Sequence, residues 1–126
     1  MKPTILLIED NEQNRYLATF LLEKAGYAII PASDGKLGIE LADRVQPQLI
    51  LLDIQLPTMD GYTVAQALRC NPALNHIPII AVTSYAMVGD REKALAAGCT
   101  GYLEKPIDPE TFVADIERFL REAKPK

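Results

Sequence analysis

The chain has 126 residues, a length that predicts one ordinary domain over residues 1–126. Its formal net charge of −4 argues against a nucleic-acid-binding surface, and no apolar stretch approaches the roughly 18 residues that a membrane span requires. Two cysteines, Cys70 and Cys99, are too few for a disulfide framework, and no signal-peptide pattern is present, so we expect a protein of the reducing cytoplasm.

Strand-like and helix-like segments alternate along the chain. Short apolar runs bounded by turn signals predict strands buried on both faces, at residues 4–8, 28–32, 49–52, 79–82 and 101–104. Helical spacing of apolar residues predicts helices that follow these strands in turn, over 11–25, 34–44, 62–69, 87–97 and 109–122. Asp10 or Asn11 can cap the first helix, Gly26 and Gly98 are stop signals, and Pro109 is a good start for the last helix.

Five βα units in succession predict an α/β fold, a doubly wound parallel sheet with helices on both faces. These rules do not fix the strand order. The flavodoxin-like order 2-1-3-4-5 would place the first and third strands side by side at a switch point. In the second helix, Gly35 and Gly38 weaken the pattern, and we expect Leu37, Leu41 and Val45 to define its apolar face.

Polar side chains follow four of the expected strands. Glu9 and Asp10 follow the first strand, Asp53 the third, Thr83 the fourth and Lys105 the fifth. Ligands of open parallel sheets bind in the crevice outside the carboxyl ends of the strands. We therefore expect three carboxylates, a hydroxyl and an ammonium around one crevice, a set that suits a divalent metal and a phosphoryl group.

The carboxylates indicate the chemistry of this crevice. Adjacent strands lie about 5 Å apart, so Asp10 and Asp53 would repel each other unless one is protonated or a cation lies between them. Mg²⁺ suits such an oxygen-rich site, and Glu9 could add charge through a water. An aspartate can also attack a phosphoryl group, while Lys105 neutralises one of its oxygens and Thr83 donates to another.

Each of these residues also has an ordinary structural explanation. Glu9 and Asp10 could form a surface turn with a helix cap, and Asp53 could be a loop residue. Thr83 could be a β-branched strand residue, and Lys105 a surface lysine. We favour the site because all five lie at strand ends of one polarity.

The chain resembles the receiver domain of two-component response regulators from Ile5 to Leu120. The matching segments are Ile8-Glu-Asp-Asn11, Leu51-Leu-Asp-Ile-Gln-Leu-Pro57, Met59-Asp-Gly61, Val82-Thr83 and Glu104-Lys-Pro106. The Glu-Asp-Asn opening and the Thr-Ser-Tyr-Ala-Met segment are also similar to stand-alone DivK-type receivers and to receivers of hybrid histidine kinases. The resemblance implies the five-stranded sheet order 2-1-3-4-5.

The resemblance also implies roles for the acidic residues. Asp53 is similar to the phosphoacceptor of the family. Asp10 and Asp53 would bind Mg²⁺ directly, the backbone carbonyl of Gln55 would join them, and Glu9 would act through a water. Lys105 is similar to the phosphate-contacting lysine, and its bond to Pro106 would be a cis peptide in this family.

Further positions are similar to those that carry or tune the signal. Thr83 and Tyr102 resemble the switch pair, in which the ring moves inward when the threonine approaches the phosphate. Gln55 and Tyr85 lie at positions that influence dephosphorylation in the family. We hypothesise that Tyr85 shields the phosphoryl group from attacking water.

These inferences predict a receiver that accepts a phosphoryl group from a histidine kinase or a histidine phosphotransfer protein. It would catalyse only its own phosphorylation and dephosphorylation, and would contact a downstream protein target through the fourth helix, fifth strand and fifth helix. We expect a monomer or a weak dimer, with no nucleic acid or membrane as a partner.

Three other classes of protein could share parts of this pattern. A haloacid-dehalogenase-type phosphatase needs a second acid two residues after its nucleophile, where this chain has Gln55, and the chain has no cap domain. A nucleotide-binding module is disfavoured because neither G-x-G-x-x-G nor a Walker A motif is present. A phosphorylation-independent adaptor on the receiver scaffold stays open as the alternative.

Overall fold

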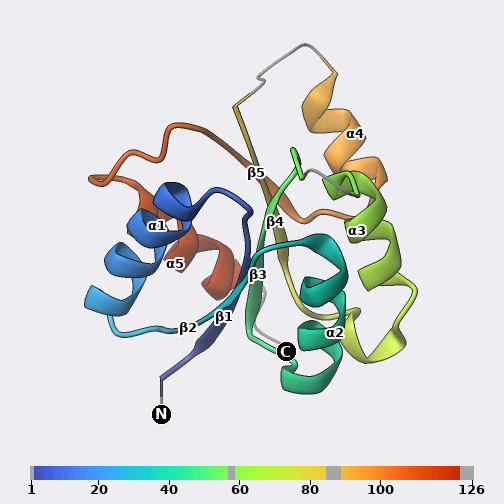
Figure 1. Cartoon of the computed structure of the whole chain (residues 1–126), viewed down its shortest axis with the longest axis horizontal. Helices are drawn as coiled ribbons and strands as arrows, with labels where there is room; N and C mark the ends of the chain where they lie inside the picture. The colour runs from blue at the N-terminus through green and yellow to red at the C-terminus, as the bar shows by residue number, and fades with distance from the viewer. Residues whose placement is uncertain (1, 57–58, 85–88, 123–126) are drawn as a thin grey trace.

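In the computed structural model, five parallel strands form one sheet between two layers of helices (Figure 1). The structure describes residues 2–56, 59–84 and 89–122. The strands are β1 (Thr4–Ile8), β2 (Ala28–Ala32), β3 (Leu49–Asp53), β4 (Ile79–Thr83) and β5 (Gly101–Glu104). Their order is β2-β1-β3-β4-β5 with every pair parallel, which confirms the flavodoxin-like order.

The helices divide between the two faces of the sheet (Figure 1). One face carries α1 (Glu12–Lys24) and α5 (Phe112–Glu122), and the other carries α2 (Gly35–Val45), α3 (Gly61–Arg69) and α4 (Asp90–Ala96). A short 3-10 helix, η1 (Pro72–Leu74), precedes β4. No helix in the described ranges is long and apolar enough to cross a membrane.

Strands β3 and β4 are buried along their whole length, because helices cover both faces of the sheet. Side chains on one face of the sheet join buried residues of α1 and α5, such as Leu22 and Ile116. Side chains on the other face join α3 and α4 through residues such as Leu68 and Ala94. The core therefore has two halves, and the sheet between them fixes the positions of the strand ends.

The ends of α1 follow from local chemistry. Asn11, and not Asp10, caps the helix, because Asn11 Oδ1 accepts the backbone N–H of Asn14 at 2.9 Å. Beyond the helix, Gly26 has φ +102°, the left-handed conformation that ends helices and that glycine adopts without strain. Capping by Asn11 leaves the carboxylate of Asp10 available to the edge of the sheet.

Of the three residues expected to form the apolar face of α2, Leu41 packs against the core, whereas Leu37 and Val45 are exposed. Leu37 and Val45 are 38% and 37% exposed, and the buried residues of the helix are Gly35, Gly38 and Ala42. A Cβ on Gly38 would lie 2.5 Å from the side chain of Ile8. The helix therefore packs on β1 through its small residues, because a larger side chain there would collide with the sheet.

One helix start differs from expectation, and another cannot be compared with it. The regular part of α5 begins at Phe112, and Pro109 lies in the preceding turn, where the carbonyl of Asp108 accepts the N–H groups of Thr111 and Phe112 at 3.1 and 2.9 Å. The described part of α4 begins at Asp90, and the expected start at residue 87 lies outside the described residues.

The edge strand β2 contains a proline. Pro31 lies opposite Leu7 of β1 and is exposed. The Ala28 N–H and the Ala32 carbonyl both bond toward β1, to the Pro3 carbonyl and the Glu9 N–H. Because backbone groups alternate along a strand, the nitrogen of Pro31 faces the outer edge of the sheet.

Candidate functional site

An open cleft of about 570 Å³ lies at the carboxyl edge of the sheet. The register pairs Ile8 of β1 with Leu52 of β3. The next residues, Glu9 and Asp53, therefore lie side by side where the two strands end. The cleft is lined by Glu9, Asp10, Asn11, Asn14, Asp53, Gln55, Ser84, Lys105 and Pro106. The strand ends that the sequence marked with polar residues therefore meet at one place.

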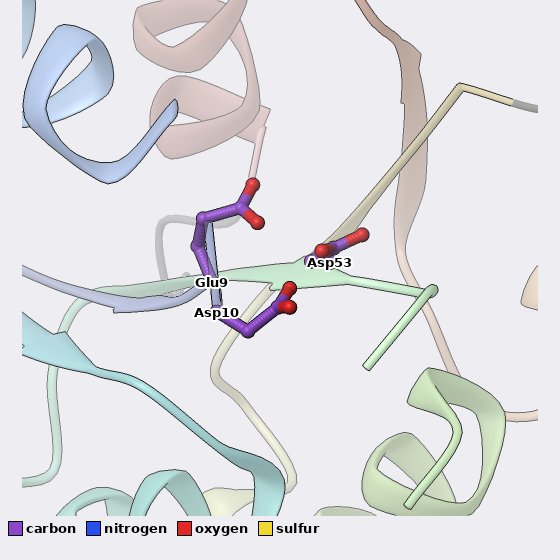
Figure 2. A group of neighbouring side chains, drawn as sticks. All are labelled: Glu9, Asp10 and Asp53. Carbon is purple, nitrogen blue, oxygen red and sulfur yellow. The ribbon is translucent and has the colours of Figure 1, made fainter. Parts of the chain in front are cut away.

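Three carboxylates gather in this cleft (Figure 2). Glu9 and Asp10 come from the end of β1 and Asp53 from the end of β3, and each offers an oxygen within 4.8 Å of the others. Glu9 and Asp53 are buried, whereas Asp10 is exposed. Figure 2 shows the Asp10 carboxylate directed toward Asp53. Such an oxygen-rich group suits a hard divalent cation.

A single ammonium is shared between two of these carboxylates. Lys105 Nζ lies 2.8 Å from Glu9 Oε1 and 3.4 Å from Asp53 Oδ2. Within the described ranges, no basic side chain forms an ion pair with the Asp10 carboxylate. Burial raises the pKa of Glu9 to about 7; the neighbouring Asp53 raises it as well, and Lys105 opposes both. The cleft therefore carries more negative charge than Lys105 can neutralise.

Backbone groups hold the acidic side chains in place. The N–H of Asn11 donates to Glu9 Oε2 at 3.2 Å, and the N–H of Gln55 donates to Asp53 Oδ1 at 3.0 Å. From α1, Arg15 Nη1 donates to the carbonyls of Glu9 and Asp10 at 2.9 and 3.3 Å. These bonds orient the carboxylates before any cation or phosphoryl group binds.

The residues expected to respond to phosphorylation lie on the neighbouring strands. The register pairs Asp53 with Val82, so Thr83 is the residue after its partner, and Thr83 is 2% exposed. Tyr102 is half-buried on β5, where its ring packs against the core on the α3 and α4 side. Tyr85 lies outside the described residues.

Lys105 and Pro106 follow β5 at the edge of the cleft. Their peptide bond is cis, the form that the family resemblance implies. The N–H of Lys105 donates to the carbonyl of Thr83 at 2.8 Å, which ties this segment to the end of β4. Lys105 is thereby held on the same side of the cleft as Asp53.

Two contacts at the site were not predicted from the sequence. One is the bond from Arg15 to the carbonyls of Glu9 and Asp10, and the other joins the Gln55 side chain to Thr83, with Nε2 to Oγ1 at 3.1 Å. The first depends on how α1 turns back over the end of β1, and the second on how the segments after β3 and β4 approach each other. The helical position of Arg15, one turn after the Asn11 cap, was the only available signal for the first.

A parallel sheet in this order, with an acidic pair, an aspartate and a lysine at its carboxyl edge, defines the class to which the chain belongs. It is a member of the response regulator receiver domain family, whose model matches residues 5–117. The resemblance drawn from the sequence motifs is thus confirmed. Receiver domains are signalling modules of two-component systems and not enzymes that turn over a separate substrate.

Individual relatives agree with this assignment. The chain is 41% identical to the polar-differentiation response regulator DivK of Brucella anthropi over 123 residues, which covers 98% of this chain and 100% of that protein. DivK of Brucella ovis is similar to the same extent. The chain therefore matches these relatives over their full length.

Solved structures share the fold. The chemotaxis response regulator CheY4 of Vibrio cholerae has a TM-score of 0.90 and 27% identity, with 94% of this chain and 99% of that chain covered. The receiver domain of a sensor histidine kinase from Pseudomonas aeruginosa has a TM-score of 0.88 and 34% identity, covering 96% and 99%. That structure holds a magnesium ion in its active-site cleft.

Proposed function

We propose that this chain is a phosphorylatable receiver that accepts a phosphoryl group on Asp53 from the histidine of a kinase or of a phosphotransfer protein. The observation that carries the proposal is the setting of Asp53. This buried carboxylate receives the N–H of Gln55 on one oxygen and faces Lys105 with the other, beside the acidic pair Glu9 and Asp10. A buried carboxylate with polar partners on an open cleft suits a nucleophile better than a structural ion pair.

The transfer is a simple exchange of bonds. An oxygen of Asp53 forms a bond to phosphorus while the bond from phosphorus to the donor imidazole nitrogen breaks, and the electron pair stays on that nitrogen. Lys105 neutralises a phosphoryl oxygen, and the hydroxyl of Thr83 donates to another. Phosphoryl transfer depends mainly on such positioning and charge neutralisation. Hydrolysis by water in the same cleft returns Asp53 to its resting state.

The acidic cleft fits Mg²⁺. Asp10, Asp53 and the backbone carbonyl of Gln55 would hold the ion directly, and Glu9 through a water. The excess of carboxylate charge and the raised pKa of Glu9 support this fit, because both would be relieved by a cation. When bound, the ion supplies neutralisation of the carboxylate and phosphoryl oxygens.

The product of the reaction is a binding state. A phosphoryl group adds roughly −1.5 to −2 charges and new acceptor oxygens to Asp53. Thr83 then moves toward it, and the half-buried ring of Tyr102 takes the space that Thr83 leaves. Repacking of the face formed by α4, β5 and α5 would present it to a downstream protein target, with phosphorylation biasing an existing equilibrium.

The setting of this function follows from general features of the chain. Cys70 and Cys99 are both free thiols, which fits the reducing cytoplasm. We assign the protein as a monomer or weak dimer whose partners are proteins. Output through protein contacts would let the single receiver of residues 1–126 act without a nucleic-acid or membrane partner.

Mass spectrometry of the intact protein tests the proposal. Incubation with Mg²⁺ and acetyl phosphate should add one phosphoryl group to the unmodified chain and none to Asp53→Asn. Asp43→Asn, which changes an exposed carboxyl on α2, is the matched control and should be phosphorylated normally. A folded, unmodified chain that gains nothing from acetyl phosphate or from a phosphohistidine donor would favour a phosphorylation-independent adaptor on the same scaffold.

A further inference from the structure

The side chain of Gln55 joins two loops that flank the site. Gln55 follows β3, whereas Thr83 and Ser84 lie where β4 ends. The Gln55 carboxamide donates from Nε2 to Thr83 Oγ1 at 3.1 Å and accepts at Oε1 from Ser84 Oγ at 2.9 Å. Its backbone N–H donates to Asp53 at the same time. One residue therefore contacts both the proposed phosphoacceptor and the proposed switch threonine.

The backbone N–H of Ser84 fixes which end of the Gln55 carboxamide is the oxygen. The backbone N–H of Ser84 faces Gln55 Oε1 at 3.5 Å, and a backbone nitrogen can only donate. The Ser84 hydroxyl reaches the same oxygen. The carbonyl end of the carboxamide therefore belongs beside Ser84, and its nitrogen faces Thr83. In this pair Thr83 accepts the hydrogen bond.

The two sides of this link differ in burial. Thr83 is 2% exposed, while Gln55 and Ser84 line the open cleft. Gln55 thus lines the cleft that a phosphoryl group would enter, and its carboxamide also holds the hydroxyl of Thr83. A movement of the Thr83 hydroxyl away from Gln55 Nε2 would lengthen or break this bond.

We propose that Gln55 is a positioning residue whose carboxamide holds Thr83 in its resting place and thereby sets how readily the chain switches. This inference rests on the proposed function, because it assumes that Thr83 moves toward a phosphoryl group on Asp53. Ser84 is bound to the same carboxamide, so the end of β4 and the loop after β3 change together. Loss of the link should favour the switched arrangement.

Beryllofluoride, a phosphoryl mimic that binds an aspartate, measures this effect. At saturating Mg²⁺, so that differences in metal affinity drop out, Gln55→Met should bind beryllofluoride about two- to tenfold more tightly than the unmodified chain, the net worth of one neutral hydrogen bond. Methionine keeps the length of the side chain and removes its donor and acceptor. Gln66→Met makes the same change on the exposed face of α3 and should leave the affinity unchanged.

Two further measurements separate this role from a merely structural one. If Gln55→Met merely damaged the loop after β3, beryllofluoride binding would become weaker, whereas loss of the positioning bond should make it tighter. Ser84→Ala should tighten binding less than Gln55→Met, and the double variant should bind no more tightly than Gln55→Met, since both changes remove the same link. In ligand-free Gln55→Met, the amide NMR signals of Ser84 and Tyr102 should lie partway toward their positions in the complex.

The outcomes distinguish this inference from the function on which it rests. If the unmodified chain binds beryllofluoride and Gln55→Met binds it equally or more weakly, the positioning role of Gln55 is wrong and the receiver chemistry stands. If the folded, unmodified chain neither binds beryllofluoride nor gains a phosphoryl group, the proposed function fails, and the role of Gln55 fails with it.

Discussion

Two largely buried cations, Lys105 and Arg69, lie at opposite ends of the strands and have contrasting surroundings. At the carboxyl edge, Lys105 lies among carboxylates and contacts Glu9 and Asp53 at 2.8 and 3.4 Å. At the other edge, Arg69 at the end of α3 lies among neutral acceptors. Its Nε donates to the carbonyl of Gly98 at 2.8 Å, and Nη1 and Nη2 reach further partners.

The partners of Arg69 come from two connections of the chain. Nη1 donates to the carbonyls of Leu74 and Ile77 before β4, at 2.9 and 2.8 Å, and Nη2 donates to Thr100 Oγ1 before β5 at 3.2 Å. Gly98 leaves room for this side chain, since a Cβ there would lie 2.5 Å from Arg69 Cγ. Arg69 thus links the two connections to each other, and each of its three guanidinium nitrogens donates at least one hydrogen bond.

The contrast separates a structural cation from a functional one. The guanidinium of Arg69 donates to backbone carbonyls and to the Thr100 hydroxyl, all of them neutral groups of the protein itself. The carboxylates around Lys105 exceed its charge, so this end of the sheet favours an additional cation. Stability should therefore depend on Arg69, and phosphoryl chemistry on Lys105.

The largest effect expected from this contrast is on stability. Arg69→Met should lower the free energy of unfolding by about 3 kcal/mol, because several buried carbonyls lose their donor. Urea denaturation measures this loss, with Arg44→Met on the exposed surface of α2 as the control. Equal stability of the two variants would show that the hydrogen bonds of Arg69 contribute nothing to stability. A loss of beryllofluoride binding in folded Arg69→Met would show that Arg69 also affects the phosphoryl site.

A smaller effect, of a different kind, is expected at the other cation. Lys105→Met should slow phosphorylation by acetyl phosphate about thirtyfold, because a preorganised positive charge near the transferred group is lost. Lys36→Met, an exposed lysine on α2, should react at the normal rate. Quenched-flow or mass measurements at saturating Mg²⁺ give the rates. A normal rate in Lys105→Met would remove this residue from the proposed chemistry.

The smallest effect concerns Glu9 and pH. Its pKa is raised from 4.5 to about 7 in the folded chain, so the folded state binds this proton more tightly than the unfolded state. Without metal, the stability that the proton confers should be present below about pH 4.5 and lost as pH rises to about 7, whereas Glu9→Gln should show no such loss from this position. Urea midpoints at several pH values, in EDTA, measure the difference.

Magnesium should weaken this trend. Because the ion favours the ionised carboxylate, its affinity should rise over the same pH range, and the loss of stability should shrink in its presence. If the stability difference between the unmodified chain and Glu9→Gln does not change from pH 4.5 to 7 without metal, Glu9 is ionised throughout this range.

Much of the fold and site could be predicted because strands and their ends are local signals. Apolar runs marked the strands, and the polarity of a parallel sheet required Glu9, Asp10 and Asp53 to meet at one edge. The order of the strands needed the family resemblance, since connection rules allow several. The roles assigned to these residues stay predictions until the experiments above are made.

What could not be predicted depends on close approach and on loops. The apolar stripe of α2 suggested Leu37 and Val45, but Gly38 faces the sheet because Ile8 occupies the space that a larger residue would need. Gln55 was singled out for its carbonyl and its position, whereas the bonds of its side chain arise only when two loops fold against each other. Neither feature has a periodic signature in the sequence.

Pro31 has a consequence for how copies of this chain meet in solution. Its nitrogen faces the free side of β2 and carries no hydrogen, so this edge of the sheet lacks one of the donors that an incoming strand would require. A second copy cannot extend the sheet there in regular register. Copies of this chain are therefore hindered from joining their sheets into fibres through β2, which leaves the β5 edge and the helical faces for association.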